Sequence, residues 1–194
     1  MQQERGRNGG PNPEAEEVRL LARIAAGDKL AFEALYRMYF PRLSRFIGRM
    51  ARNAALIEEV VNDTMLVVWQ KAATFDGTCK VSTWVFAIAY RKTLKGLKAS
   101  DEPVESDASL YEDDSGNQPE QTMKRQQLQQ TVAEALDQLP AAQRAVMVLT
   151  YYHDMAYSEI AEVVECPLNT VKTRMFHARH RLKDLLWNER ESSQ

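Results

Sequence analysis

Residues 158–181 have the sequence SEIAEVVECPLNTVKTRMFHARHR, and this stretch decides the fold of the C-terminal half. It predicts two helices with helix-turn-helix spacing, separated by the break 165–167, where Pro167 favours a turn. Ser158 and Thr170 are suited to cap the two helices, because a hydroxyl oxygen can accept from a free N–H group of the first turn. Apolar spacing predicts the inner faces: Ile160, Ala161 and Val164 in the first helix, and Val171, Met175 and Ala178 in the second.

The outer face of the second predicted helix, 169–186, is basic. Lys and Arg occur five times between Asn169 and Lys183 without an acid, whereas the preceding helix carries Glu159, Glu162 and Glu165. Long cations reach phosphates and base edges in the major groove, and an aromatic ring can contact a thymine methyl group. The pattern favours DNA binding, although an ordinary solvated helix has similar residues. The outward residues are Lys172, Thr173, Arg174, Phe176, His177, Arg179, His180, Arg181 and Lys183.

The rest of the chain also has helical periodicity and no alternating strand pattern of useful length, which predicts an all-α fold. The first helix has its apolar residues over 18–25 and ends at Gly27-Asp28. Further predicted helices cover 30–39, a segment that begins at Pro41, 54–73, 82–98 with Ser82 as N-cap, 123–139 and 141–152.

Acidic residues are concentrated in one segment. The 194-residue chain has a formal net charge of −2, which by itself argues against a nucleic-acid partner. Residues 101–120, however, contain eight acids and no Lys or Arg, and the rest of the chain has 25 bases against 19 acids, a net charge of +6. Such a segment buries too little apolar surface to order itself.

This charge pattern predicts two small helical domains joined by a flexible acidic linker, in the order: a disordered tail (1–13), a first domain (14–100), the linker (101–121), a second domain (122–187) and a C-terminal tail (188–194).

Several other classes of protein are disfavoured by the composition. No apolar run reaches the roughly 18 residues of a membrane span, and the polar N-terminus has no apolar stretch of a secretion signal. Cys79 and Cys166 are too few for a disulfide framework or a zinc quartet, so a cytoplasmic protein is expected. His177 and His180 are three residues apart, but their basic neighbours disfavour a metal ion, and no glycine-rich phosphate loop or catalytic constellation is present.

A second basic region lies at 80–98, where five cations occur without an acid beside Trp84, Phe86 and Tyr90. Aromatic rings and cations together suit single-stranded nucleic acid, but Trp84 is expected to be core more readily than a stacking platform. The loop 76–81 is the better candidate for contact with an extruded base. A third basic run, Arg37, Arg42, Arg45, Arg49 and Arg52, suits either a phosphate backbone or a solvated helix face.

The long helix 54–73 has a mixed polar surface. Its core stripe is predicted to include Ile57, Val61, Met65 and Val68. Trp69, together with Thr64 and Val67, is interpreted either as part of a partly exposed protein interface or, for Trp69, as buried.

Five segments in order carry a family resemblance: Gly27-Asp28 with 31–36 (AFEALY); 58–64 (EEVVNDT) with Trp69; 82–85 (STWV) with 88–91 (IAYR); Leu139-Pro140 with Arg144; and 157–161 (YSEIA) with 166–174 (CPLNTVKTR) and Ala178-Arg179. Over 20–186 the chain resembles the extracytoplasmic-function (ECF) sigma factors of bacterial RNA polymerase, a family of the sigma-70 superfamily. The resemblance implies a sigma region 2 domain followed by a sigma region 4 domain.

The resemblance also implies a function without catalysis or a cofactor: promoter recognition, DNA melting and transcription initiation at a stress-type regulon. The implied partners are the clamp helices of the largest polymerase subunit, the flap of the second-largest subunit, promoter DNA, and a cognate anti-sigma factor that is often membrane-bound; no small-molecule substrate is expected. The acidic linker is expected to pass through the polymerase toward the RNA exit channel, where its charge could mimic the transcript.

The resemblance assigns site residues in three groups. Core polymerase binding is assigned to Glu59, Asn62, Asp63, Leu66, Trp69 and Gln70. Contact with the minus-ten element, including a flipped base at loop 76–81, is assigned to Asp76, Thr78, Lys80, Trp84, Arg91, Lys92 and Lys95. Contact with the minus-thirty-five element, through the helix-turn-helix 158–177, is assigned to Thr170, Lys172, Thr173, Arg174, Phe176, His177 and Arg179.

Two other functions fit the residues. A stand-alone helix-turn-helix regulator would usually need a dimer, and no dimerisation heptad is seen. A helical adaptor would use the basic faces to bind acidic protein. Specific DNA binding without polymerase favours the first, and transcription that is indifferent to Lys172→Glu and Arg174→Glu favours the second.

Overall fold

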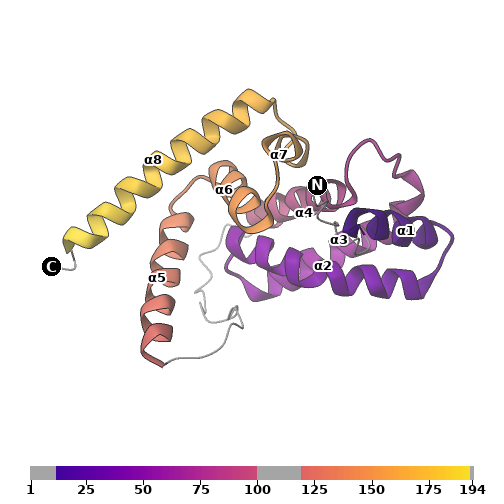
Figure 1. The fold of residues 1–194 in the computed structure, drawn as a ribbon, viewed down its shortest axis with the longest axis horizontal. Coiled ribbons are helices and arrows are strands. Elements are labelled where there is room, and N and C mark those ends of the chain that lie inside the picture. The colour runs from indigo at the N-terminus through magenta and orange to yellow at the C-terminus, as the bar shows by residue number, and fades with distance from the viewer. Residues whose placement is uncertain (1–11, 100–118, 193–194) are drawn as a thin grey trace, which may run out of the picture.

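The chain folds into helices only, over the part that the structure describes. A computed structural model describes residues 12–99 and 119–192, so most of the predicted acidic linker lies outside the described residues. The helices are α1 (Pro13–Ala25), α2 (Lys29–Met50), α3 (Ala54–Lys71), the short 3-10 helix η1 (Ala72–Thr74), α4 (Val81–Ala99), α5 (Pro119–Asp137), α6 (Ala141–His153), α7 (Tyr157–Val163) and α8 (Leu168–Ser192). Figure 1 shows α1–α4 gathered on one side, with α5–α8 on the other. The predicted all-α class is confirmed.

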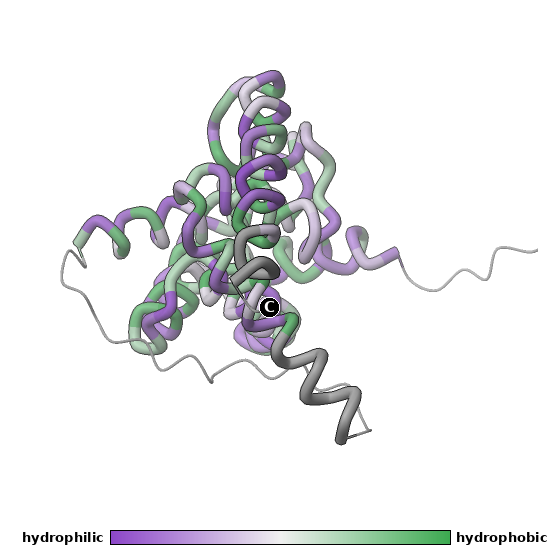
Figure 2. The backbone as a smooth tube through the Cα atoms, turned by 90° about the vertical axis from the view of Figure 1, so that its left-hand side faces the viewer, coloured by the Kyte–Doolittle hydropathy of each residue, from purple (hydrophilic) through white to green (hydrophobic). Residues whose placement is uncertain are grey.

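Helices α1–α4 form one bundle around a continuous apolar core. Figure 2 shows hydrophilic and hydrophobic residues interleaved along the helices, as amphipathic helices require. The predicted stripe of α3 is confirmed, because Ile57, Val61, Met65 and Val68 are all buried. Thr64, which was expected on a partly exposed face, is instead completely buried, since it lies on the same side of the helix as Val61 and Val68.

One prediction in this bundle is wrong: 30–39 and the segment after Pro41 form a single helix, α2, with Pro41 inside it. A proline removes one backbone hydrogen bond and usually ends or kinks a helix. Here Leu35 and Tyr39 before it, and Leu43 and Phe46 after it, are all completely buried in the same core. Burial on both sides of the proline offsets the lost hydrogen bond.

Three predicted helix caps also differ from the structure. α4 begins at Val81, which is fully buried, so Ser82 lies inside the first turn and is not the N-cap. α7 begins at Tyr157, where Glu159 Oε2 accepts from the backbone N–H of Ala156 at 2.7 Å in place of a Ser158 cap. α8 begins at Leu168, which places Thr170 within its first turn. In each case the helix starts one or two residues before the predicted position, which is within the usual variation of helix ends.

The C-terminal helices form the predicted helix-turn-helix, with α6 and α5 packed behind it. The inner residues Ile160, Val171, Met175 and Ala178 are buried, and Val163 joins them. The turn after α7 places Glu165 at φ 51°, in the left-handed region, and the N–H of Cys166 donates to the carbonyl of Ala161 at 3.0 Å. This is the Schellman arrangement of helix ends, in which glycine is usual at the position that Glu165 occupies.

The two halves of the chain are in direct contact. α6 packs on α2, and α7 packs on α4 (Figure 1). At the centre, the His153 ring lies between Phe46 and Phe86, with ring centroids 6.0 Å and 4.7 Å away. The structure is therefore a closed one, with the second half folded back onto the first.

Candidate nucleic-acid interfaces

The outer face of α8 is solvent-exposed along the segment predicted to read DNA. Val171, Met175 and Ala178 anchor the helix in its core, so the residues between them point outward. Phe176 is 59% exposed and its ring lies 4.4 Å from that of His180. This face suits a groove, because a rigid backbone presents cations and one aromatic ring together. The exposed members are Lys172, Thr173, Phe176, His177 and Arg179.

Two of the predicted DNA residues on α8 are held by neighbours. The half-buried Arg174 donates to Cys166 Sγ at 3.6 Å, and Arg179 Nε donates to the hydroxyl of Tyr151 at 3.1 Å. Tyr151 is 54% exposed at the end of α6, so it lies beside the recognition face without having been predicted. Its position in α6 gives no sequence signal for such a role. Thr170 is half-buried in the first turn.

The loop before α4 is ordered by Asp76. Its carboxylate accepts from the backbone N–H of Thr78 at 3.0 Å and from the Thr78 hydroxyl at 2.8 Å, and these bonds lower the pKa of Asp76. Gly77 has φ +72°, which the turn requires and which glycine adopts without strain. Asp76 and Thr78 are both exposed at the tip of the loop.

The remaining predicted minus-ten residues differ in how accessible they are. Trp84 is half-buried, with its ring 5.6 Å from Phe75, which favours the structural interpretation of this residue. Lys95 is exposed, and Lys92 Nζ pairs with Asp63 Oδ2 of α3 at 2.7 Å.

Lys80 and Arg91 are paired with the other half of the chain. Lys80 Nζ lies 2.8 Å from Glu159 Oε1, and Arg91 pairs with Glu165. Two residues that were expected to contact DNA therefore contact α7 and the turn after it.

A surface on α3 carries the residues predicted to bind the polymerase. Glu59, Asn62, Asp63, Leu66, Trp69 and Gln70 recur at helical spacing, so they share one face. Leu66 is 52% exposed on this face. Trp69 is half-buried, in edge contact with Phe32 of α2 at 5.2 Å. A half-buried ring agrees with the partly exposed face and not with the buried alternative.

Aromatic residues of α2 extend this surface. Phe32, Tyr36 and Phe40 follow one another along the helix, with Tyr36 and Phe40 stacked at 5.8 Å. The Tyr36 hydroxyl donates to Asn62 Oδ1 at 3.0 Å, which joins the two helices. Phe40 is 43% exposed. Phe32 and Tyr36 lie in the predicted helix 30–39, whereas Phe40 lies just beyond it and was missed. The core side of this helix is formed by Leu35 and Tyr39, which are completely buried.

The third basic run does not form one solvated or phosphate-binding face. Arg42 pairs with the buried Glu17 at 3.1 Å, Arg49 lies over the ring of Tyr152 at 4.4 Å, and Arg52 pairs with Asp137. Tyr152 and Asp137 belong to the second half of the chain. Both interpretations of this run are therefore wrong for Arg42, Arg49 and Arg52.

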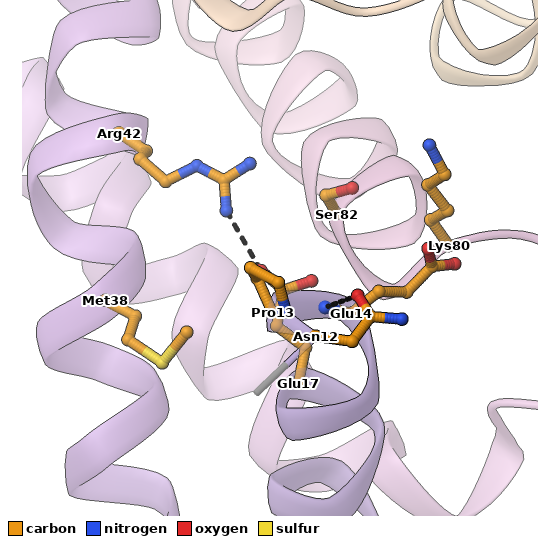
Figure 3. Close-up of a pocket in the computed structure, with 8 residues that line it drawn as sticks. All are labelled: Asn12, Pro13, Glu14, Glu17, Met38, Arg42, Lys80 and Ser82. Carbon is orange, nitrogen blue, oxygen red and sulfur yellow. Dashed lines mark hydrogen bonds and ion pairs between the residues drawn. The ribbon is translucent and has the colours of Figure 1, made fainter. Parts of the chain in front are cut away.

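A cleft of about 630 Å³ lies where the start of α1, the middle of α2 and the start of α4 meet (Figure 3). Arg42 reaches across it to Glu17, and Lys80 and Ser82 line it next to the loop. The lining has both signs of charge, so it does not select an anion or a cation.

Among the described residues, no group of His, Cys, Asp and Glu side chains could hold a metal ion. The helices within 12–99 and 119–192 include none that is long and apolar enough to cross a bilayer.

Comparison with known proteins agrees with this geometry. The model of Sigma-70 region 2 matches residues 35–102, and the model of Sigma-70 region 4 matches residues 129–182. The ECF RNA polymerase sigma factor RpoE of Cereibacter sphaeroides is 32% identical over 157 residues, which cover 80% of this chain and 86% of the relative. The RNA polymerase sigma-H factor of Pseudomonas aeruginosa is 28% identical over 181 residues, or 88% of this chain and 94% of that factor.

Two solved structures have a similar fold. CnrH in complex with the cytosolic domain of CnrY has a TM-score of 0.67 at 24% identity, covering 88% of this chain and 97% of that one. The sigma factor RpoE in complex with the anti-sigma factor NepR from Bartonella quintana has a TM-score of 0.60 at 24% identity, covering 80% and 96%.

The fold and its exposed basic helix thus define a two-domain, helix-turn-helix transcription initiation factor. The chain belongs to the ECF sigma factors of RNA polymerase. As a member of this family it acts with RNA polymerase in promoter recognition and transcription initiation.

Proposed function

We propose that this chain directs its polymerase to a distinct set of promoters by using three separate surfaces. The α3 surface binds core polymerase, the loop 76–81 with α4 engages the minus-ten element, and the outer face of α8 reads the minus-thirty-five element. The observation that carries this assignment is α8, because one helix buries Val171, Met175 and Ala178 and exposes Lys172, Thr173 and Phe176 between them. The domain limits 14–100 and 122–187 belong to the same proposal.

The α3 surface suits a protein partner better than DNA. Leu66 and Phe40 are exposed apolar side chains near acidic residues such as Glu59, and acids repel the phosphate backbone. Aromatic residues surrounded by polar groups are typical of a protein interface. We assign this surface to the clamp helices of the largest polymerase subunit.

The minus-ten surface suits a melted strand. Asp76 and Thr78 at the loop tip can accept and donate hydrogen bonds to the edge of an extruded base, and Lys80 and Arg91 supply charge for phosphates. Trp84 supports the loop through Phe75 and stays half-buried, so we assign it to holding the loop and not to stacking on a base.

Control by an anti-sigma factor completes the proposal. The structural relative CnrH was solved with the cytosolic domain of CnrY bound, and RpoE of Bartonella quintana was solved with the anti-sigma factor NepR bound. These complexes support a cytoplasmic chain that is held inactive until it is released. The acidic linker 101–121 is proposed to pass through the polymerase, and it lies mostly outside the described residues.

The test is run-off transcription with the core polymerase of the bacterium that encodes the chain, on a promoter library. Lys172→Glu with Arg174→Glu should lower transcript yield about 10- to 100-fold, because base and phosphate contacts are each lost. Lys29→Glu, the same charge reversal at an exposed site on α2, is the matched control. Failure of the unmodified chain to support initiation at any promoter would contradict the proposal.

Polymerase binding is tested separately by fluorescence anisotropy with labelled chain and core enzyme. Leu66→Asp should weaken binding about 10-fold or more, as expected for an apolar anchor at the centre of an interface. Val18→Asp is the matched control, because Val18 is 45% exposed on α1 and is not one of the residues assigned to the α3 surface. An equal loss of affinity for core polymerase in both variants would show that α3 is not part of the polymerase interface.

A further inference from the structure

Tyr151 of α6 holds an arginine on the outer face of α8. Its hydroxyl oxygen accepts from Arg179 Nε at 3.1 Å, and the guanidinium carbon of Arg179 lies 5.8 Å from the centre of the Tyr151 ring. Both side chains are exposed. An arginine on a protein surface has many rotamers, so a partner that binds its Nε atom fixes the direction in which the guanidinium points.

The two helices that carry this pair belong to one packed unit. α8 is anchored beside Arg179 by Ala178, which is completely buried. Val148 and Leu149 of α6 are completely buried as well, and α6 packs directly on α8. Tyr151 therefore extends from a backbone whose place beside α8 is set within the second half of the chain.

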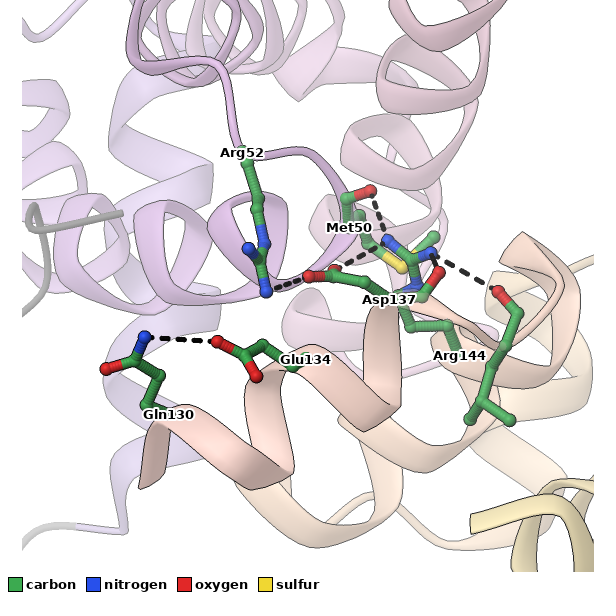
Figure 4. A network of polar contacts seen from close by, with 7 residues as sticks. Met50, Arg52, Gln130, Glu134, Asp137 and Arg144 are labelled. Carbon is green, nitrogen blue, oxygen red and sulfur yellow. Dashed lines mark hydrogen bonds and ion pairs between the residues drawn. The ribbon is translucent and has the colours of Figure 1, made fainter. Parts of the chain in front are cut away.

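The start of α6 is fixed by Arg144. Its Nη1 atom donates to Asp137 Oδ1 at 3.2 Å, and its Nη2 atom donates to the carbonyls of Asp137 and Leu139, at and just after the end of α5 (Figure 4). All of these groups belong to the second half of the chain. A binding site on rigid elements holds its groups in one geometry, and the pair on α6 and α8 meets this condition.

Arg179 keeps its full charge, because the group that holds it is neutral. Within the described part of the chain it forms no ion pair with a carboxylate, whereas Lys80 and Lys92 of α4 are each paired with one. Tyr151 uses the N–H group on Nε, which leaves the N–H groups of the two Nη atoms. Because the Tyr151 oxygen accepts with a lone pair, its own hydrogen remains for a further acceptor. The pair thus offers donors and one positive charge, as an anion requires.

The position of Arg179 along α8 favours a phosphate over a base. Lys172, Phe176 and Arg179 are exposed and spaced at i, i+4 and i+7, so they form one stripe of the helix. Arg179 lies about 10 Å further along α8 than Lys172, at about 1.5 Å per residue. The first residues of a recognition helix read base edges, and the major groove is about 12 Å wide. A residue two turns further on therefore meets the phosphates at the border of the groove.

We propose that Tyr151 and Arg179 form a clamp for one backbone phosphate beside the minus-thirty-five element. The two Nη atoms of Arg179 bind the two free oxygens of this phosphate. The Tyr151 hydroxyl fixes Arg179 through Nε and donates its own hydrogen to the same phosphate. A phosphate contact of this kind sets the register of α8 on the duplex. The inference rests on the proposed function, since it takes the outer face of α8 as the minus-thirty-five surface.

The test uses the complete chain bound to core polymerase, with duplexes of a promoter selected from the run-off library. Single methylphosphonate groups, which lack the phosphate charge, are placed one at a time along both strands of the minus-thirty-five region, and affinity is measured by anisotropy. Neutralising the clamped phosphate should weaken binding about 10-fold. Arg179→Gln should weaken binding to the normal duplex by a similar factor and should abolish the effect of methylphosphonate at this phosphate alone.

Tyr151→Phe tests the hydroxyl, because phenylalanine keeps the ring. This variant should bind the normal duplex about three- to tenfold more weakly. On the duplex that is neutralised at the clamped phosphate, the difference from the unmodified chain should fall below about twofold, since the acceptor has lost its charge. Tyr152→Phe is the matched control, because the Tyr152 ring lies against Arg49 and its hydroxyl makes no hydrogen bond within the described residues.

Three results would overturn this inference and leave α8 as the reading helix. The first is a Tyr151→Phe variant that binds every duplex as tightly as the unmodified chain does. The second is a loss in Tyr151→Phe that persists at every methylphosphonate position, which would give the hydroxyl a purely structural role. The third is an Arg179→Gln variant that relaxes discrimination at one base pair and keeps every methylphosphonate effect, because Arg179 would then read a base.

Failure of the proposed function has a different signature. It would appear as a chain that initiates at no promoter, or as unchanged promoter affinity in Lys172→Glu with Arg174→Glu. Either result would overturn the phosphate clamp together with the proposed function, since both depend on α8 as a DNA surface.

Discussion

Acidification should open the contact between the two halves of the chain through His153. This side chain ends α6 and is enclosed by Phe46 and Phe86, and its Nε2 atom is buried with no hydrogen-bond partner among the described residues. Burial, and then the charges of Arg42 and Arg45 on α2, lower its pKa to about 4. The closed form therefore holds a neutral imidazole, because the charges that act on it are the cations of Arg42 and Arg45, and the carboxylate of Glu17 is already paired with Arg42.

The sign and size of the effect follow from the two pKa values. In the open form His153 meets water and titrates near 6.5, so the open form binds the proton first as the pH falls. The closed form is fully stable above about pH 6.5 and loses stability as the pH falls toward its own pKa of about 4. Between pH 7.5 and pH 5 this amounts to about 2 kcal/mol, or about a 25-fold shift toward the open form.

The measurement is pulsed electron spin resonance between spin labels at Glu58→Cys and Lys183→Cys, in a chain with Cys79→Ser and Cys166→Ser, from pH 7.5 to pH 5 at constant ionic strength. His153→Leu is the control, because leucine fills the apolar site and does not titrate, so its distance should not change over this range. Any change in label distance that remains in the leucine variant comes from carboxylates such as Asp137, whose pKa is raised mainly by burial. Equal responses of the unmodified chain and the leucine variant would refute the reasoning.

Three further predictions concern stability, measured by urea unfolding. Thr64→Val should stabilise the chain by about 1 kcal/mol, because the Thr64 hydroxyl is fully buried without a hydrogen-bond partner among the described residues; an unstable variant would show that this oxygen is satisfied. Arg144→Met should destabilise it by about 2–4 kcal/mol, since the carbonyls of Met50, Asp137 and Leu139 lose their donor; a change below about 0.5 kcal/mol would contradict this role. Ile160→Ala should cost about 2–5 kcal/mol through a cavity in the helix-turn-helix, and a loss as small as a surface substitution would place Ile160 outside the core.

Much of the fold could be predicted from apolar spacing, because burial of a stripe needs only local periodicity. The core faces of α3, α7 and α8 are examples. The continuous α2 could not be predicted, since a proline normally ends a helix and only the buried residues on both sides of Pro41 keep this one intact. Helix starts could not be fixed to the residue either: α4 begins at the buried Val81 and α8 at Leu168, each one or two residues before the predicted start.

The candidate site divides in the same way. The exposed cations of α8 were predictable, because a helix with one apolar face must expose the other. The partners of Lys80 and Arg91 were not, because Glu159 and Glu165 are more than 70 residues away along the chain. The basic run 37–52, in α2 and just after it, was interpreted wrongly for the same reason: Arg49 and Arg52 contact the second domain.

By itself, then, the sequence determined the class of protein, the helical content, and the places where charge and apolar surface lie along each helix, since these follow from local spacing and composition. Only the tertiary structure decided that the two domains are closed on each other, and that α7 lies on the face of α4 that was expected to meet DNA. Which side of a basic helix meets a partner depends on contacts between distant segments, and no local pattern records those contacts.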